Sequence, residues 1–147
     1  MESPGKQIEI SKADKPKAKV GFVDSIKDRT KENGDFRRVL YTGKHLQLVL
    51  MTIGPGEEIG AEAHDSGDQF FRIEKGKGEV SIDGHRTKIR SGDGVLVPSG
   101  ARHNIVNTGD KQLRLYSLYG PPQHRIGTVQ AAKAKVHEEH FDGKTDE

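Results

Sequence analysis

The chain contains no cysteine, which excludes both a disulfide framework and thiolate chemistry. It also lacks any run of about 18 apolar residues, the length that a membrane-spanning helix needs. The N-terminal residues have no apolar stretch of the kind found in signal peptides. We therefore expect a cytoplasmic protein that has no membrane partner.

A strong excess of one charge is absent as well. The 24 lysines and arginines nearly balance the 22 acidic residues, and the net charge is +2. Charges of both signs are spread along the chain, so they do not create the strong positive field that is typical of nucleic-acid binding. The sequence therefore predicts no nucleic-acid partner.

The composition is polar, with 31% hydrophobic and 5% aromatic residues, but the polarity is concentrated at the two ends of the chain. A length of 147 residues fits one domain with one core. Residues 1–20 carry several lysines among prolines, with Ile8 and Ile10 as large apolar residues. We interpret this segment as a flexible arm or as an edge strand that pairs with a partner subunit.

Residues 21–127 are expected to form the barrel domain. Between residues 21 and 43 we expect short strands and one turn, at Asn33-Gly34-Asp35. The segment after Thr128 is rich in helix formers, and Thr128 is a suitable N-cap. We therefore predict that residues 128–147 form a short C-terminal helix and a tail.

Short runs of β-forming residues, separated by turn signals, fill residues 45–120. The apolar run His45–Ile53 ends at Gly54-Pro55-Gly56. Asp83-Gly84 lies between two alternating runs, which is the strongest short hairpin signal. Leu113–Tyr119 is the last long apolar run, and no helical period interrupts the series. The pattern predicts an all-β fold, either a barrel or a sandwich.

Two segments carry side chains that commonly bind metals. In a strand, residues i and i+2 point to the same face, so Glu62 and His64 are expected to project together. Gln69 follows them after a short loop, and His103 comes from a later strand. Convergence of such side chains from separate strands is what a metal site requires.

These two segments resemble the paired motifs of the cupin superfamily, in particular the small single-domain cupins, some of which are similar to mannose-6-phosphate isomerases. The second segment matches the family's pattern of glycine, proline, glycine, histidine and asparagine in full, at Gly92, Pro98, Gly100, His103 and Asn107. The resemblance implies a double-stranded β-helix, also called a jelly-roll or cupin barrel, and a homodimer.

The first segment departs from the family's pattern. Cupins usually show His-x-His followed by Glu, whereas this chain has Glu62, His64 and Gln69. His64 and His103 therefore match family ligands in identity, and Glu62 and Gln69 match them only in position. The resemblance implies a metal set of two histidines and one carboxylate, with Gln69 as a weaker oxygen ligand. Such a set suits iron and also accepts Mn, Co, Ni or Zn.

Two functions remain open on this sequence. One is a metal-dependent enzyme that acts on a small polar metabolite, with an isomerase-, dioxygenase- or decarboxylase-like reaction. The alternative is a non-catalytic cupin that binds a small carbohydrate-like ligand, with or without metal. A sugar-phosphate isomerase would need a cation to anchor phosphate, and Arg72 and Arg102 are the candidates near the two motifs.

Other side chains near the motifs are assigned by alternation and spacing. Phe71 shares a strand face with Gln69 and is a candidate wall of the site, although core packing is the more common role of such a residue. Tyr116 and Tyr119 lie on opposite faces of the last strand, so at most one of them points inward. The other histidines lack partners at ligand spacing, except for a pair three residues apart on the predicted C-terminal helix that we interpret as surface residues; they are His45, His85, His124 and the pair His137 and His140.

Overall fold

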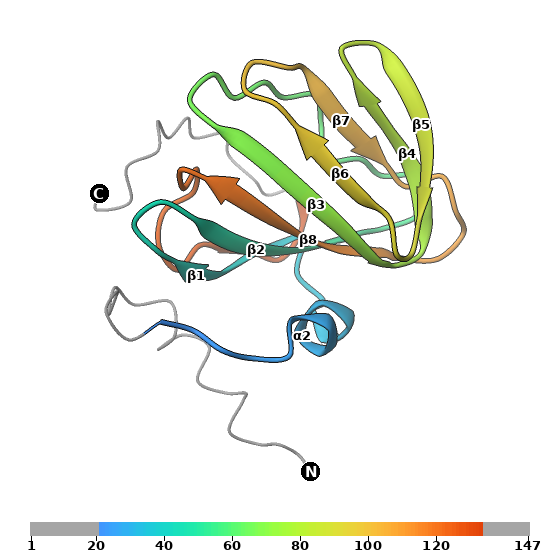
Figure 1. Cartoon of the computed structure of the whole chain (residues 1–147). Coiled ribbons are helices and arrows are strands. Elements are labelled where there is room, and N and C mark those ends of the chain that lie inside the picture. The colour runs from blue at the N-terminus through green and yellow to red at the C-terminus, as the bar shows by residue number, and fades with distance from the viewer. Residues whose placement is uncertain (1–20, 134–147) are drawn as a thin grey trace.

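The computed structural model describes residues 21–133, so the arm predicted for residues 1–20 and most of the predicted C-terminal helix lie outside the described residues. Within this range the chain forms one helix and nine strands (Figure 1). In chain order they are α2 (Ile26–Glu32), β1 (Arg37–Thr42), β2 (Gln47–Ile53), β3 (Asp68–Lys75), β4 (Lys77–Ile82), β5 (His85–Arg90), β6 (Gly94–Val97), β7 (His103–Val106), β8 (Leu113–Gly120) and β9 (Val129–Gln130).

The strands form two antiparallel sheets that are packed as two layers (Figure 1). The larger sheet has the order β6-β3-β8-β2-β1-β9, and the smaller one has the order β5-β4-β7. Non-consecutive strands are neighbours in both sheets, as expected when a chain winds around a barrel. The predicted all-β fold, a double-stranded β-helix, is confirmed.

The core lies on the inner face of the larger sheet and against the smaller one. On β3, Gln69, Phe71 and Ile73 are buried, whereas Phe70 and Arg72 are only half-buried, as alternation predicts. Hydrophobic residues from both sheets complete the same cluster, which contains Phe36, Val39, Val49, Met51, Ile53, Ile59, Phe71, Ile73, Val80, Ile89, Val95, Val97, Ala101, Ile105, Leu113, Leu115 and Tyr119.

The Asp83-Gly84 hairpin forms as the sequence predicts. The two residues connect β4 to β5, and both have positive φ angles, 48° at Asp83 and 88° at Gly84. Two positive φ angles are what a two-residue type I′ turn requires, and aspartate and glycine tolerate them best.

Helix α2 is a correction, because short strands were expected between residues 21 and 43. Phe22 and Ile26 stand four residues apart and pack against a hydrophobic cluster on the outer face of the larger sheet, which contains Leu40, Leu48 and Leu50. The Arg29 guanidinium, almost buried, forms a 2.7 Å ion pair with Asp24. Tertiary packing of one apolar face therefore stabilises a helix whose sequence is mostly charged.

The start of the predicted C-terminal helix is wrong. The Thr128 hydroxyl donates back to the Arg125 carbonyl (2.7 Å) and does not cap a helix. Val129 and Gln130 instead form β9, in register with Arg38 and Arg37 of β1. The edge of β1 carries backbone groups that need partners, and this requirement overrides the local helix propensity.

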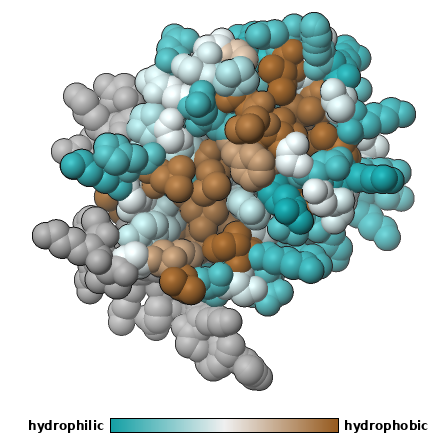
Figure 2. All heavy atoms as spheres, in the orientation of Figure 1, coloured by the Kyte–Doolittle hydropathy of each residue, from teal (hydrophilic) through white to brown (hydrophobic). Residues whose placement is uncertain are grey.

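Hydrophobic residues also gather on the surface. Figure 2 shows a hydrophobic band across the middle of the face seen in Figure 1. On the outer face of the larger sheet, Leu96 is 70% exposed and lies in register with Phe70, which in turn pairs with Leu118. Among residues 21–133, no helix has the length and hydrophobicity needed to cross a membrane.

Candidate metal centre

The two motifs meet through the backbone of Glu62 and His103. The Glu62 N–H donates to the His103 carbonyl (2.9 Å), and the His103 N–H donates to the Glu62 carbonyl (2.8 Å). This isolated antiparallel bridge ties the segment between β2 and β3 to the start of β7. Glu62 and His64 therefore lie in a connecting segment, not in a long strand, but they still project to the same side.

Three donor side chains converge at this bridge. One ligand atom from each of Glu62, His64 and His103 lies within 4.8 Å of the other two. His64 Nε2 is 3.1 Å from Glu62 Oε1, and the rings of His64 and His103 have centroids 5.7 Å apart. A carboxylate and two imidazoles at these separations fit a divalent transition metal.

His103 is already oriented as a metal ligand. Its side chain is 3% exposed, and its Nδ1 lies 3.2 Å from the Ala101 carbonyl. A carbonyl only accepts, so Nδ1 carries the proton and Nε2 keeps its lone pair. Nε2 is buried and has no hydrogen-bond partner among the described residues. Burial lowers the pKa of His103, more than the Ala101 hydrogen bond raises it, which keeps the ring neutral.

Glu62 is held in its charged form. Burial raises the pKa of its carboxyl, but the hydrogen bond with His64 and the electrostatic influence of His64, Arg37 and His103 together lower it by more. The net pKa therefore lies below the ordinary value for a glutamate. Glu62 can thus supply a carboxylate near neutral pH, which is the form that binds metal.

Gln69 enters the interior from β3, in register with Tyr119 of β8. Its side chain is 3% exposed, and its Nε2 donates to Ser117 Oγ (2.9 Å). The Oε1 atom is buried without a hydrogen-bond partner among the described residues. A buried acceptor without a partner is unfavourable, and an amide oxygen is a group that can serve as a weak metal ligand.

Tyr119 is the tyrosine that points inward, and Tyr116 packs against the outer cluster, so the predicted division between the two is confirmed. The Tyr119 ring makes an edge contact with His64, with centroids 5.9 Å apart. Burial raises its pKa to about 12, against the lowering effects of Arg37 and of hydrogen bonds with Ser117 and Gln69. The phenol therefore keeps its proton and can donate a hydrogen bond.

His124 belongs to the same interior, although its spacing gave no sign of this. Its ring makes an edge contact with Tyr119 (5.1 Å between centroids), and its Nε2 is buried without a partner among the described residues. Gln47 fixes the backbone of His124, because its Nε2 donates to the His124 carbonyl (2.7 Å) and its Oε1 accepts from the His124 N–H (2.9 Å). Burial and then the charge of Arg37 lower the pKa of His124 to about 3, so the ring is neutral.

Arg37 is a second residue that sequence reasoning missed. It lies on β1, opposite Met51 of β2, and is 5% exposed. A signal was present, since Arg37 stands two residues before Val39, a core residue of the same strand. Its guanidinium influences the pKa values of Glu62, Tyr119 and His124, so its charge acts on the same interior.

The two arginines considered as phosphate anchors do not face this interior. Arg102 is exposed, and its neighbours Ala101 and His103 are buried, so its side chain points outward. Arg72 lies on the outer face of β3, where its Nε is 3.8 Å from Glu74. Arg37 takes their place as a cation directed into the barrel.

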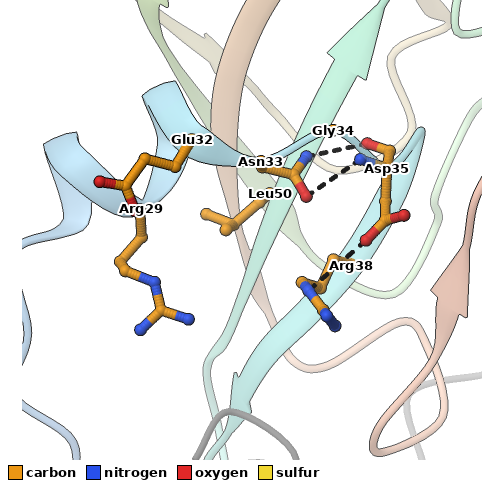
Figure 3. Close-up of a pocket in the computed structure, with 7 residues that line it drawn as sticks. All are labelled: Arg29, Glu32, Asn33, Gly34, Asp35, Arg38 and Leu50. Carbon is orange, nitrogen blue, oxygen red and sulfur yellow. Dashed lines mark hydrogen bonds and ion pairs between the residues drawn. The ribbon is translucent and has the colours of Figure 1, made fainter. Parts of the chain in front are cut away.

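A separate cavity of about 220 Å³ lies between α2 and the outer side of β1 and β2 (Figure 3). It is lined by Arg29, Glu32, Asn33, Gly34, Asp35, Arg38 and Leu50. Its two arginines are paired with acids, Arg29 with Asp24 and Arg38 with Asp35. The cavity shares none of the candidate metal ligands.

Comparison with known proteins points to one family. The chain matches the model of the cupin domain over residues 49–119. A crystal structure of a Bacillus halodurans protein is 47% identical, with a TM-score of 0.76, covering 77% of this chain and 90% of that protein. An uncharacterized protein of Bacillus subtilis is 44% identical over 119 residues, which are 77% of this chain and 64% of that protein. The chain thus spans less than two thirds of this relative's length.

A more distant relative has a described ligand. The oxalate-binding protein of Thermotoga maritima is 29% identical to this chain over 71 residues. The match covers 48% of this chain and 59% of that protein.

Proposed function

The chain belongs to the cupin family, and on that basis we propose that it is a small metal-dependent cupin in which Glu62, His64 and His103 hold a divalent ion. The observation that carries the proposal is the convergence of these three donors within 4.8 Å. Gln69 joins them as a weaker ligand through its buried Oε1. Mn, Fe, Ni, Co and Zn all accept such a set.

We propose further that the protein is an enzyme acting on a small polar metabolite. A bound divalent ion would polarise an oxygen atom of the substrate. The protein's own residues surround that position with oriented groups: Tyr119 keeps its proton as a donor, and His124 presents a neutral nitrogen. Arg72 and Arg102 face away from the interior, and Arg37 offers one guanidinium where phosphate commonly recruits several cations, so the arrangement favours a dioxygenase- or decarboxylase-like reaction over sugar-phosphate isomerisation.

A second candidate is a cupin that binds its ligand without turnover. The similarity to the oxalate-binding protein of Thermotoga maritima favours it. If the non-catalytic cupin binds its ligand without metal, a chelator should leave its stability unchanged. The metal-dependent enzyme should instead lose stability when a chelator removes the metal. A metal that binds only the folded state at 1,000 times its Kd stabilises it by about 4 kcal/mol. For a chain of this size, removal of such a metal lowers Tm by about 10 °C.

Metal analysis of protein purified without an affinity tag tests the site. We expect a stoichiometric divalent ion in the wild type and its loss in Glu62→Ala and His103→Ala. His85→Ala is the matched control, because His85 is exposed on β5 and takes no part in the cluster. If neither site variant loses metal, the proposed ligands are wrong. Wild-type protein with little metal and a Tm that does not respond to chelator would support the non-catalytic candidate.

The proposal includes a cytoplasmic homodimer. The outer face of the larger sheet offers a hydrophobic surface for the second copy, centred on Leu96, Phe70 and Leu118. Exposed apolar residues grouped in this way are typical of protein interfaces.

A further inference from the structure

Arg37 is a buried charge that lacks an ion pair among the described residues. Its Nη1 donates to the neutral Gln130 Oε1 (2.8 Å), and its guanidinium carbon lies 5.1 Å from the centroid of the Phe36 ring. Its Nε is buried and has no hydrogen-bond partner within residues 21–133. A buried guanidinium without a carboxylate is costly, and a protein retains one most readily where it binds an anion.

The position of Arg37 in the sheet directs it into the barrel. One row of residues runs across four neighbouring strands of the larger sheet. In strand order it contains Arg37 of β1, Met51 of β2, Leu115 of β8 and Ile73 of β3. These three partners are fully buried core residues, so Arg37 belongs to an inward-facing row. The guanidinium therefore extends from the wall of the barrel toward its interior.

A continuous set of ring contacts runs from the candidate metal centre to His124, and the charge of Arg37 acts on Tyr119 and His124 in that set. The His103 and His64 rings are 5.7 Å apart, the His64 and Tyr119 rings 5.9 Å, and the Tyr119 and His124 rings 5.1 Å. Tyr119 thus lies between a candidate metal ligand and His124. His124 Nε2, like Arg37 Nε, is a buried polar atom without a partner in the part of the chain that the structure describes. A ligand that contacts the metal centre and also satisfies these atoms would lie along Tyr119.

The charges of the interior define the kind of ligand. Without metal, the negative charge of Glu62 is balanced by the positive charge of Arg37. A divalent ion then leaves two positive charges in excess, which favours an anionic ligand. A guanidinium binds the planar pair of oxygens of a carboxylate through two parallel hydrogen bonds. Phosphate commonly recruits several cations, and the two other arginines near the motifs face away.

We propose that this interior binds a small carboxylate, with the carboxylate oxygens on the Arg37 guanidinium and on His124 Nε2, and with the other end of the molecule at the centre formed by Glu62, His64 and His103. This inference rests on the proposed metal-dependent function and adds a substrate class to it. A small dicarboxylate matches the charge of the metal-bound interior, since it supplies two negative charges.

The test compares Arg37→Gln with Arg38→Gln in the full chain loaded with Mn²⁺. Arg38 is the matched control, because it is the next residue on β1 and pairs with Asp35 on the outer side (3.5 Å; Figure 3). Oxalate is the probe, and oxamide and inorganic phosphate are the neutral and phosphate comparisons, all measured by calorimetry. We expect Arg37→Gln to weaken oxalate binding at least about tenfold, the equivalent of about 1.4 kcal/mol, with unchanged Mn²⁺ affinity. Arg38→Gln should change neither affinity.

Several results would overturn the inference and leave the proposed function standing. They are Mn²⁺ binding with no oxalate binding, equal oxalate affinity in Arg37→Gln and wild type, or tighter binding of phosphate than of oxalate. If Mn²⁺ does not bind, the proposed function fails, and the metal-free protein still tests Arg37. Its Nε–H signal in a ¹H–¹⁵N spectrum, identified by its loss in Arg37→Gln, should shift when oxalate is added, and an unchanged signal would overturn the assignment.

His124→Phe is the second variant, because it keeps a ring against Tyr119 and removes both nitrogens. We expect weaker oxalate binding with unchanged Mn²⁺ affinity. Unchanged oxalate affinity in this variant would remove His124 from the proposed site.

Discussion

Replacing Gln69 with glutamate tests the interior cluster more sharply than removing a ligand does, because the substitution adds a carboxylate and hardly changes the shape. Gln69 is 3% exposed, and its Oε1 has no hydrogen-bond partner among the described residues. In metal-free protein the new carboxylate would share the interior with Glu62. If the two carboxylates stand about 6 Å apart, they repel each other by about 3 kcal/mol at an effective dielectric constant of about 20.

This repulsion predicts a loss of stability that depends on pH. A repulsion of about 3 kcal/mol corresponds to a pKa raised by about two units in the folded state. A raised pKa means that the folded state binds the proton more tightly than the unfolded state does. The metal-free variant should therefore resemble the wild type below about pH 4 and lose stability as the pH rises through the raised pKa, by about 1–3 kcal/mol at pH 8.

A divalent ion should reverse the sign of this effect. The ion neutralises both carboxylates, so binding relieves the repulsion that destabilises the metal-free variant. The energy of that repulsion then adds to the free energy of metal binding. We expect the Mn²⁺ affinity of Gln69→Glu to rise by about 10- to 100-fold, which corresponds to about 1.4–2.8 kcal/mol. The variant should then be less stable than the wild type without Mn²⁺ and at least as stable with it.

Urea denaturation at pH 5.5 and pH 8, with and without Mn²⁺, measures both effects, and calorimetry gives the affinity. Gln112→Glu is a suitable control, because Gln112 is exposed beside Arg114. This variant should bind Mn²⁺ with the same affinity as the wild type. A Gln69→Glu variant that is destabilised at pH 8 but gains nothing from Mn²⁺ would show that the interior does not bind metal at this position.

Two further predictions concern the barrel and its acid stability. Gly78→Ala should lower the free energy of unfolding by about 1–3 kcal/mol in urea denaturation, since a Cβ at this position would collide with the Val106 carbonyl. Gly34→Ala is the control and should have little effect, because a Cβ there would meet no atom within 4 Å. Equal losses in the two variants would contradict the close packing of β4 on β7. Acid should destabilise metal-free protein because the folded pKa of His124, about 3, lies below its ordinary value. As the pH falls, the unfolded state therefore binds the proton before the folded state does, which lowers the free energy of unfolding of the wild type by about 2 kcal/mol at pH 5. Between pH 7 and pH 5, His124→Phe should lose about 2 kcal/mol less stability than the wild type.

The sequence predicts those parts of the fold that local chemistry determines. The Asp83-Gly84 turn requires positive φ, and the alternation along β3 follows from the pleat of a strand, so both could be read from the residues alone. Helix α2 and strand β9 are different. The helix depends on the outer hydrophobic cluster, and β9 depends on the open edge of β1. Both contacts join segments that are distant in sequence, and they outweigh local propensity.

The candidate site divides in the same way. Glu62, His64 and His103 stand in two motifs whose spacing predicts that they meet, and the structure brings them together. Arg37 and His124 reach the interior through pairings that no motif encodes. Arg37 depends on the register of β1 with β2, and His124 depends on the hydrogen bonds of its backbone with Gln47.

The missed arginine changes the meaning of the altered first motif. With glutamate at both position 62 and position 69, the interior would hold two carboxylates opposite Arg37 and would be negative without metal. With Gln69 it holds one carboxylate and one guanidinium, so it is neutral without metal and gains two positive charges with a divalent ion. The amide at position 69 therefore does not simply weaken the metal site. It leaves positive charge available for an anionic ligand, which is the condition under which a buried Arg37 that has no ion pair among residues 21–133 is favourable.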